Sequence, residues 1–102
     1  MDLNQLILDV RQFAQDRDWE RYHTPKNLCM AMSVEMAELV EHFQWATPEE
    51  SLQLDVAKRE AVEQEMADVM LYMIRLADVL NVDIEQAIRQ KMVFNAIKYP
   101  PL

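Results

Sequence analysis

The sequence predicts an all-α fold: a four-helix bundle in a single domain over residues 1–102, completed by oligomerisation. Three observations lead to this prediction. Apolar residues recur at helical spacing in four segments that short breaks separate. Good helix formers, chiefly Leu, Met, Ala, Gln, Glu and Arg, dominate the chain, and glycine is absent. The hydrophobic fraction of 51% is high for 102 residues, so we expect another subunit to cover part of the apolar surface.

The first expected helix covers residues 3–16, where apolar side chains form one stripe. Residues 17–24 break that pattern and are expected to form a loop. The loop carries Trp19, Tyr22 and His23, which are side chains that often take part in recognition.

The second expected helix starts at Thr24 and Pro25, because threonine caps helices and proline fits the first helical position. It should end near Gln44. Residues 47–50 have the form of a capping box and should open a short helical turn.

The third expected helix covers residues 56–80 and contains a stretch, 69–74, that is apolar on every side. Such a helix is surrounded, either at the centre of a bundle or at a subunit interface. The fourth helix is capped by Asp83 and reaches about Lys98, where Pro100 stops it.

The composition excludes several classes of protein. Without glycine, neither a Walker phosphate loop nor a Rossmann fingerprint forms in its usual shape. The net charge of −8 repels polyanions, so a nucleic-acid polymer is not an expected partner, although a divalent cation can bridge a small phosphorylated ligand. A lone cysteine, Cys29, leaves no intrachain disulfide and no cysteine-based zinc site. With no recognisable signal peptide or membrane span, we expect a cytoplasmic protein.

Two pairs of carboxylates are the main candidates for a functional site. Glu35 and Glu38 lie three residues apart on the second expected helix, and Glu65 and Asp68 lie three residues apart on the third. Residues with this spacing share one face of a helix. In an acidic chain such pairs also arise by chance as solvated acids, so the spacing alone is weak evidence.

The neighbours of these acids favour a metal site. Solvated acids often have a basic partner one turn away, as in Arg59–Glu63 and Glu85–Arg89, but the four candidates have mostly apolar neighbours there. Clustered carboxylates that point into a bundle repel one another unless a cation lies between them. Oxygen-only ligands favour Mg²⁺, Mn²⁺ or Ca²⁺ over zinc. A di-iron site would need two Glu-x-x-His pairs, and the single match, Glu20 to His23, falls in the loop.

Several other residues are candidates for substrate binding. Trp19, Trp45 and Tyr72 suit stacking on a nucleobase, although core packing is the ordinary role of such aromatics. Lys91 and Asn95 lie one turn apart on the fourth expected helix, where a lone cation could meet a phosphate and an amide a base or sugar. The alternative for Lys91 is a side chain that reaches solvent.

The order of these residues resembles the MazG-type, all-α nucleotide pyrophosphohydrolases. Glu35–Glu38, then 26 intervening residues, then Glu65–Asp68 match the acidic motifs of that family. Further segments along nearly the whole chain are similar to its dCTP pyrophosphatase branch: residues 17–23, 25–27, 43–45, 71–72, 91–92, 95 and 98–100.

The resemblance implies hydrolysis of a (deoxy)nucleoside triphosphate to the monophosphate and pyrophosphate, as house-cleaning of the nucleotide pool. In that family the four acids hold Mg²⁺, and compact members form dimers or tetramers with sites between subunits. The implied substrate pocket comprises Trp19, His23, Trp45, Tyr72, Lys91 and Asn95. Lys91 would meet the phosphates, and His23 would lie near the mouth of the pocket.

The base is expected to be cytosine or a 5-modified cytosine, with adenine as second choice. Val10 stands where relatives of the vertebrate dCTP enzyme carry a histidine, and the loop after Trp45 is shorter than theirs.

A water attacking the α-phosphorus needs orientation, for which Glu38 is the first candidate and Glu35 or Glu65 the alternatives. Two other functions remain open: a non-catalytic nucleotide-binding or helical interaction module, and a phosphoribosyl-ATP pyrophosphohydrolase.

Overall fold

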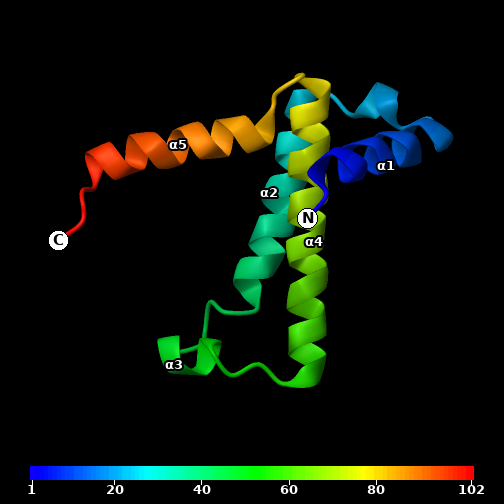
Figure 1. Ribbon diagram of the computed structural model, residues 1–102. Coiled ribbons are helices and arrows are strands. Elements are labelled where there is room, and N and C mark those ends of the chain that lie inside the picture. The colour runs from blue at the N-terminus through cyan, green and yellow to red at the C-terminus, as the bar shows by residue number, and fades with distance from the viewer.

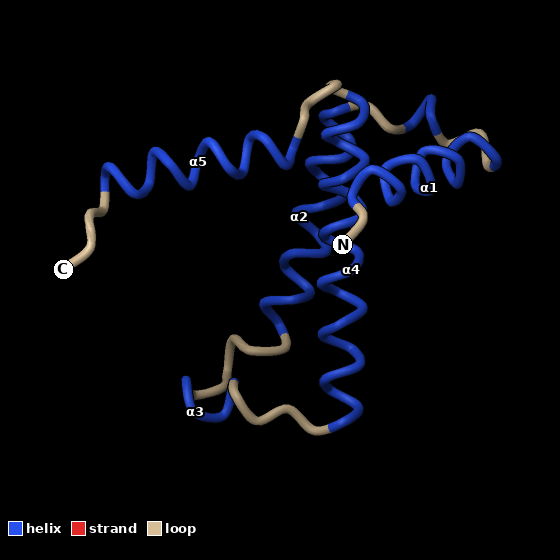
Figure 2. The backbone as a smooth tube through the Cα atoms, in the orientation of Figure 1, coloured by secondary structure: helices blue, strands red, loops and turns tan.

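All regular secondary structure in the chain is helical, as the sequence predicts (Figures 1 and 2). The computed structural model describes all 102 residues and contains no strand. None of its helices combines the length and the apolar character needed to cross a membrane. In chain order the elements are α1 (Leu3–Asp16), a 3₁₀ turn (Glu20–Tyr22), α2 (Pro25–Glu41), α3 (Pro48–Ser51), α4 (Val56–Val79) and α5 (Ile84–Lys98).

Every α-helix begins at a residue whose side chain accepts a hydrogen bond from a backbone N–H three residues later. These caps satisfy N–H groups that the helix itself leaves unpaired. In the predicted capping box, Thr47 Oγ1 accepts from Glu50 N–H and Glu50 Oε1 accepts from Thr47 N–H, each at 3.1 Å. The capping residues are Asp2, Thr24, Thr47, Asp55 and Asp83.

The end of α2 differs from the prediction, which placed it near Gln44. The helix ends at Glu41, and the chain continues in tight turns. His42 N–H donates to Leu39 O at 3.2 Å, a shorter-range bond than the helical pattern uses. Neither glycine nor proline marks this point in the sequence, so periodicity did not reveal it.

Two helix ends adopt the left-handed backbone conformation without glycine. Asp18, after α1, has a φ of 55°, and Asn81, after α4, has a φ of 54°. After α1, Trp19 N–H donates to Ala14 O at 2.9 Å, which closes a Schellman motif. Aspartate and asparagine are the side chains that tolerate this conformation best after glycine. The motif fixes the direction in which Trp19 leaves α1.

The core lies where α2 and α4 run side by side in opposite directions and α1 crosses α4 near its C-terminal end (Figure 1). The core is small, since only a few apolar side chains are buried within one chain. The buried apolar residues are Ala14, Leu28, Val62, Ile74 and Ala77.

Helix α5 extends away from this core and leaves its apolar side chains in solvent (Figures 1 and 2). Every residue of α5 after Ile84 is exposed. Large exposed apolar patches usually mark an interaction surface. The exposed apolar side chains of α5 are Ile88, Met92, Val93, Phe94 and Ile97.

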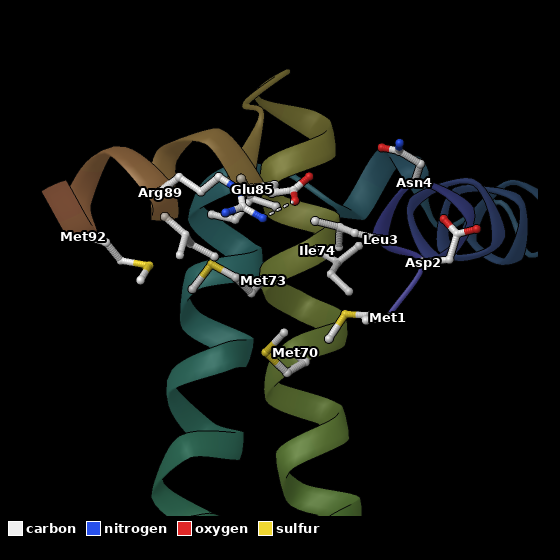
Figure 3. A pocket seen from close by; sticks show the side chains of 12 residues that line it. Met1, Asp2, Leu3, Asn4, Met70, Met73, Ile74, Glu85, Arg89 and Met92 are labelled. Atoms are coloured by element: carbon white, nitrogen blue, oxygen red, sulfur yellow. Dashed lines mark hydrogen bonds and ion pairs between the residues drawn. The ribbon is translucent and has the colours of Figure 1, made fainter.

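An apolar groove of about 890 Å³ lies between the start of α1, the middle of α4 and the first turns of α5 (Figure 3). Met70 and Met73 line it from α4 and Met92 from α5. Both α4 methionines belong to the stretch 69–74 that the sequence predicts to be surrounded, yet they remain partly exposed. The stretch is therefore not fully enclosed within one chain.

Substitutions at Asn81 test the left-handed end of α4. We expect Asn81→Ala to lower the free energy of unfolding by about 1 kcal/mol, because alanine lacks the polar side chain that tolerates this backbone. Asn81→Gly should equal or exceed the wild type, since glycine adopts the conformation freely. Urea denaturation followed by circular dichroism measures both. Equal losses for alanine and glycine would contradict the assignment.

Candidate functional site

The acidic cluster forms where α2 and α4 face each other. Glu35 and Glu38 come from α2 and Glu65 from α4, and one carboxylate oxygen of each lies within 4.8 Å of the others. All three side chains are partly buried. The i,i+3 spacing predicts that Glu35 and Glu38 share one face of α2, and in the structure both approach Glu65 on the facing helix.

No positive side chain balances this cluster. None of the ion pairs in the structure includes Glu35, Glu38 or Glu65, whereas the predicted pairs Arg59–Glu63 and Glu85–Arg89 are present. The Oε2 atom of Glu65 is buried without a hydrogen-bond partner. A buried acceptor of this kind is costly unless something binds it.

The electrostatic strain shows in the pKa of Glu35, which rises from its ordinary value of 4.5 to about 7. Burial is the largest cause, followed by the adjacent carboxyl of Glu65 and then by the charges of Glu38 and Asp68. Burial and like charges both disfavour the ionised form. An orphaned oxygen, converging carboxylates and no counter-charge together fit a hard divalent cation.

Asp68 connects the cluster to a neighbouring pocket. It lies outside the group of three close carboxylates but is near enough to raise the pKa of Glu35. It also lines a pocket of about 690 Å³ between α1, the loop that follows it and α4. Acid cluster and pocket are therefore adjacent parts of one site.

Aromatic side chains form much of this pocket. Trp19, His23 and Tyr72 all line it, and Val10 contributes from α1. The ring of Trp19 packs edge-on against Phe13, with 5.6 Å between centroids. It lies 6.2 Å from the ring of His23. The pocket thus offers flat faces suited to stacking next to the acids.

A network of charged side chains borders the same pocket and was not anticipated from the sequence. Arg75 is 6% exposed and donates from Nη1 to Asp78 Oδ2 at 2.8 Å. Arg11 donates to both oxygens of Asp78, from Nε at 2.9 Å and from Nη2 at 2.6 Å. The hydrogen bonds from Arg11 are the main reason that the pKa of Asp78 is lowered. The available sequence signal was a charged residue directly after an apolar stretch, with an acid three residues later.

The remaining candidates lie elsewhere in the chain. Trp45 follows α2 and is 89% exposed, far along the chain from the loop that holds Trp19. Lys91 and Asn95 are on the extended helix α5, and neither lines the aromatic pocket (Figure 1). One chain therefore brings together the acids and Trp19, His23 and Tyr72, but not the other three residues.

Fold and site together define a class: all-helical proteins in which paired helices hold a carboxylate cluster beside an aromatic pocket. Comparison with known proteins identifies the family. A model of the MazG-like family matches residues 30–101. The chain belongs to the MazG-like family.

Individual relatives agree with this assignment. Proteins named dCTP pyrophosphatase 1 from Bos taurus and Homo sapiens are each 41% identical over 91 residues, or 87% of this chain. The match covers 54% of each of them, so the chain spans about half the length of these curated relatives. The crystal structure of a pyrophosphatase from Archaeoglobus fulgidus superposes with a TM-score of 0.92 at 38% identity, covering 99% of this chain and 94% of that one.

The raised pKa of Glu35 predicts a pH-dependent stability difference. The folded state holds this proton more tightly than the unfolded state, so ionisation costs stability as pH rises from 4.5 to about 7. In metal-free buffer, wild type should therefore lose stability relative to Glu35→Gln across that window. Thermal unfolding at a series of pH values measures the stability difference between wild type and Glu35→Gln. Titration of the other acids and bases affects both proteins equally and cancels in this difference.

Glu63→Gln is the matched control, because Glu63 is an exposed acid on α4 that pairs with Arg59. Its difference from wild type measures the general effect of removing a surface charge from α4. If the difference between Glu35→Gln and wild type varies with pH no more than that of Glu63→Gln, Glu35 does not lie in a strained cluster.

Proposed function

We propose that this protein hydrolyses a (deoxy)nucleoside triphosphate to the monophosphate and pyrophosphate in a reaction that depends on Mg²⁺, with Mn²⁺ as a substitute. The observation that carries the proposal is the uncompensated cluster of Glu35, Glu38 and Glu65, joined through Asp68 to an aromatic pocket. Family membership and the pyrophosphatase names of its relatives support the same reaction.

Glu35, Glu38, Glu65 and Asp68 are the residues that would hold the metal. A bound Mg²⁺ would supply neutralisation of phosphate charge, which phosphoryl transfer needs more than covalent help. It would also offset the repulsion between a polyanionic substrate and a chain of net charge −8.

The side chains of the protein have separate roles in this proposal. Glu38 accepts a hydrogen bond from the water that attacks the α-phosphorus and keeps that water aligned with the leaving pyrophosphate. Trp19 and Tyr72 provide stacking surfaces for the base. Because both line the pocket that Asp68 shares, a stacked nucleoside would place its phosphates toward the acids.

The proposed base is cytosine or a 5-modified cytosine, with adenine as second choice. The names of the relatives, dCTP pyrophosphatase 1, support cytosine. The biological role would be removal of unwanted nucleotides from the cytoplasmic pool.

A second copy of the chain would complete the site. Lys91 and Asn95 lie on α5, which reaches away from its own acids, and Trp45 is almost fully exposed. The exposed apolar face of α5 and the methionine-lined groove at its base provide the surface that a dimer or tetramer would bury. In such an assembly these three residues would approach the acids of another subunit.

A nucleotide panel tests the activity. We expect Mg²⁺-dependent release of pyrophosphate and monophosphate from one preferred dNTP, and none with EDTA.

Glu38→Gln should lower kcat by at least about 100-fold, as loss of a general base does, with the helical circular dichroism signal unchanged. If nucleotides bound but none was hydrolysed, the protein would be a non-catalytic nucleotide-binding module. Preferred turnover of phosphoribosyl-ATP would instead indicate a phosphoribosyl-ATP pyrophosphohydrolase.

Subunit mixing tests whether sites are shared. Lys91→Ala and Glu38→Gln chains should each be nearly inactive alone, while a refolded mixture should regain activity because some sites combine an intact Lys91 with an intact Glu38. Absence of recovery would mean that Lys91 and Glu38 serve a site within one chain, and it would contradict sharing of the site between subunits.

Ile88→Asp, on the apolar face of α5, should reduce the assembled mass measured by light scattering. Gln90→Asp adds the same charge to the same helix outside the groove lining and serves as the control. An Ile88→Asp protein of unchanged mass would remove α5 from the interface.

A further inference from the structure

A buried cation beside the aromatic pocket has no role in the reaction described so far. Arg75 is 6% exposed and lines the pocket. Each of its guanidinium nitrogens already faces a protein partner: Nε donates to His23 Nδ1 at 3.0 Å, Nη1 donates to Asp78 at 2.8 Å, and Nη2 lies 3.9 Å from Glu20 Oε1. Such a group acts on a ligand through its neighbours rather than by direct contact.

The contact with Arg75 determines where His23 carries its proton. A guanidinium can only donate, so His23 Nδ1 must accept and is unprotonated. The neutral ring then carries its proton on Nε2, at the other side of the ring. Burial and the charge of Arg75 lower the pKa of His23, against an opposing effect of Glu20, so the ring is neutral near pH 7.

We propose that Arg75 is a positioning residue that holds His23 in the Nε2–H form, so that His23 offers a hydrogen-bond donor to an acceptor atom of the bound nucleoside. The acceptor is a carbonyl oxygen or an unprotonated ring nitrogen of the base. This inference rests on the proposed function, because it assigns a specificity role within the same pocket.

The position of His23 supports this role. Its ring lies 6.2 Å from the ring of Trp19, and both side chains line the pocket together with Tyr72. A base stacked on Trp19 therefore brings its edge close to His23. A base with a donor at that edge would face a second donor, and unpaired polar groups in a closed pocket reduce binding strongly.

The network behind Arg75 supplies a matched pair of variants. Asp78 accepts hydrogen bonds from both Arg75 and Arg11, so either arginine can be removed while the carboxylate keeps one guanidinium partner. Arg75→Met removes the donor to His23. Arg11→Met removes only the other partner of Asp78 and leaves the contact between Arg75 and His23 intact.

Nitrogen-15 NMR of the histidine ring in the 102-residue chain without nucleotide tests whether Arg75 sets the tautomer of His23. We expect His23 to show an unprotonated Nδ1 and a protonated Nε2 in wild type and in Arg11→Met. In Arg75→Met the Nδ1–H tautomer should become populated, because no donor then occupies Nδ1. A wild-type ring protonated at Nδ1, or an unchanged ring in Arg75→Met, would overturn the proposal whatever the protein hydrolyses.

A double-mutant cycle, measured by steady-state kinetics with the preferred dNTP, tests whether His23 donates a hydrogen bond to the base. Arg75→Met should raise KM about tenfold with a smaller change in kcat, because a neutral hydrogen bond to the base is lost. In a His23→Gln background, where the amide N–H₂ replaces the Nε2 donor without needing Arg75, the same substitution should have little effect. Any effect of Arg11→Met on KM should be the same in both backgrounds, because Arg11 does not act through His23.

The outcomes separate a positioning role from a structural one. An equal effect of Arg75→Met in both backgrounds would mean that Arg75 only supports the fold, and it would overturn the proposal. If the wild-type protein turned over no nucleotide, the proposed function would fail, and the tautomer measurement would still decide whether Arg75 sets the state of His23.

Discussion

The structure depends on one unfavourable interaction, the mutual repulsion of carboxylates held between α2 and α4. These two helices form the main packing contact of the chain, so the surfaces that stabilise the fold also force Glu35, Glu38 and Glu65 together. Apolar burial along the helices has to offset both the repulsion and the unpaired Glu65 oxygen. A protein tolerates such a local cost where the arrangement serves a function.

Charge is handled in opposite ways on the two sides of the site. Around the acid cluster the negative charges have no partner, which leaves room for a cation. Around the aromatic pocket, Asp78 is fully engaged by Arg11 and Arg75, and its lowered pKa reflects that pairing. The first arrangement is suited to binding an ion, and the second holds α1, the following loop and α4 in fixed relation.

Local sequence signals predicted the local features well. Caps such as Thr47 and Asp83 fixed the starts of helices, and the spacing of Glu35 and Glu38 placed both on one face. Long-range placement could not be read in the same way. The apolar stripe around Lys91 shows that α5 has a face to bury, but periodicity carries no information about which chain buries it. Arg75 was missed because two of its partners, His23 and Glu20, are distant from it in sequence and approach it only in the folded chain.

The chain has no glycine, so Asp18 and Asn81 occupy the left-handed positions at two helix ends. The absence of glycine also affects the unfolded chain. Glycine has the largest backbone freedom of any residue, so a chain without it samples fewer disordered conformations. Folding then sacrifices less conformational entropy per residue, and less buried apolar surface is needed to compensate. This helps to explain how so small a core can stabilise the fold, because the sequence restricts the unfolded state as well as stabilising the native one. The core residues are Ala14, Leu28, Val62, Ile74 and Ala77.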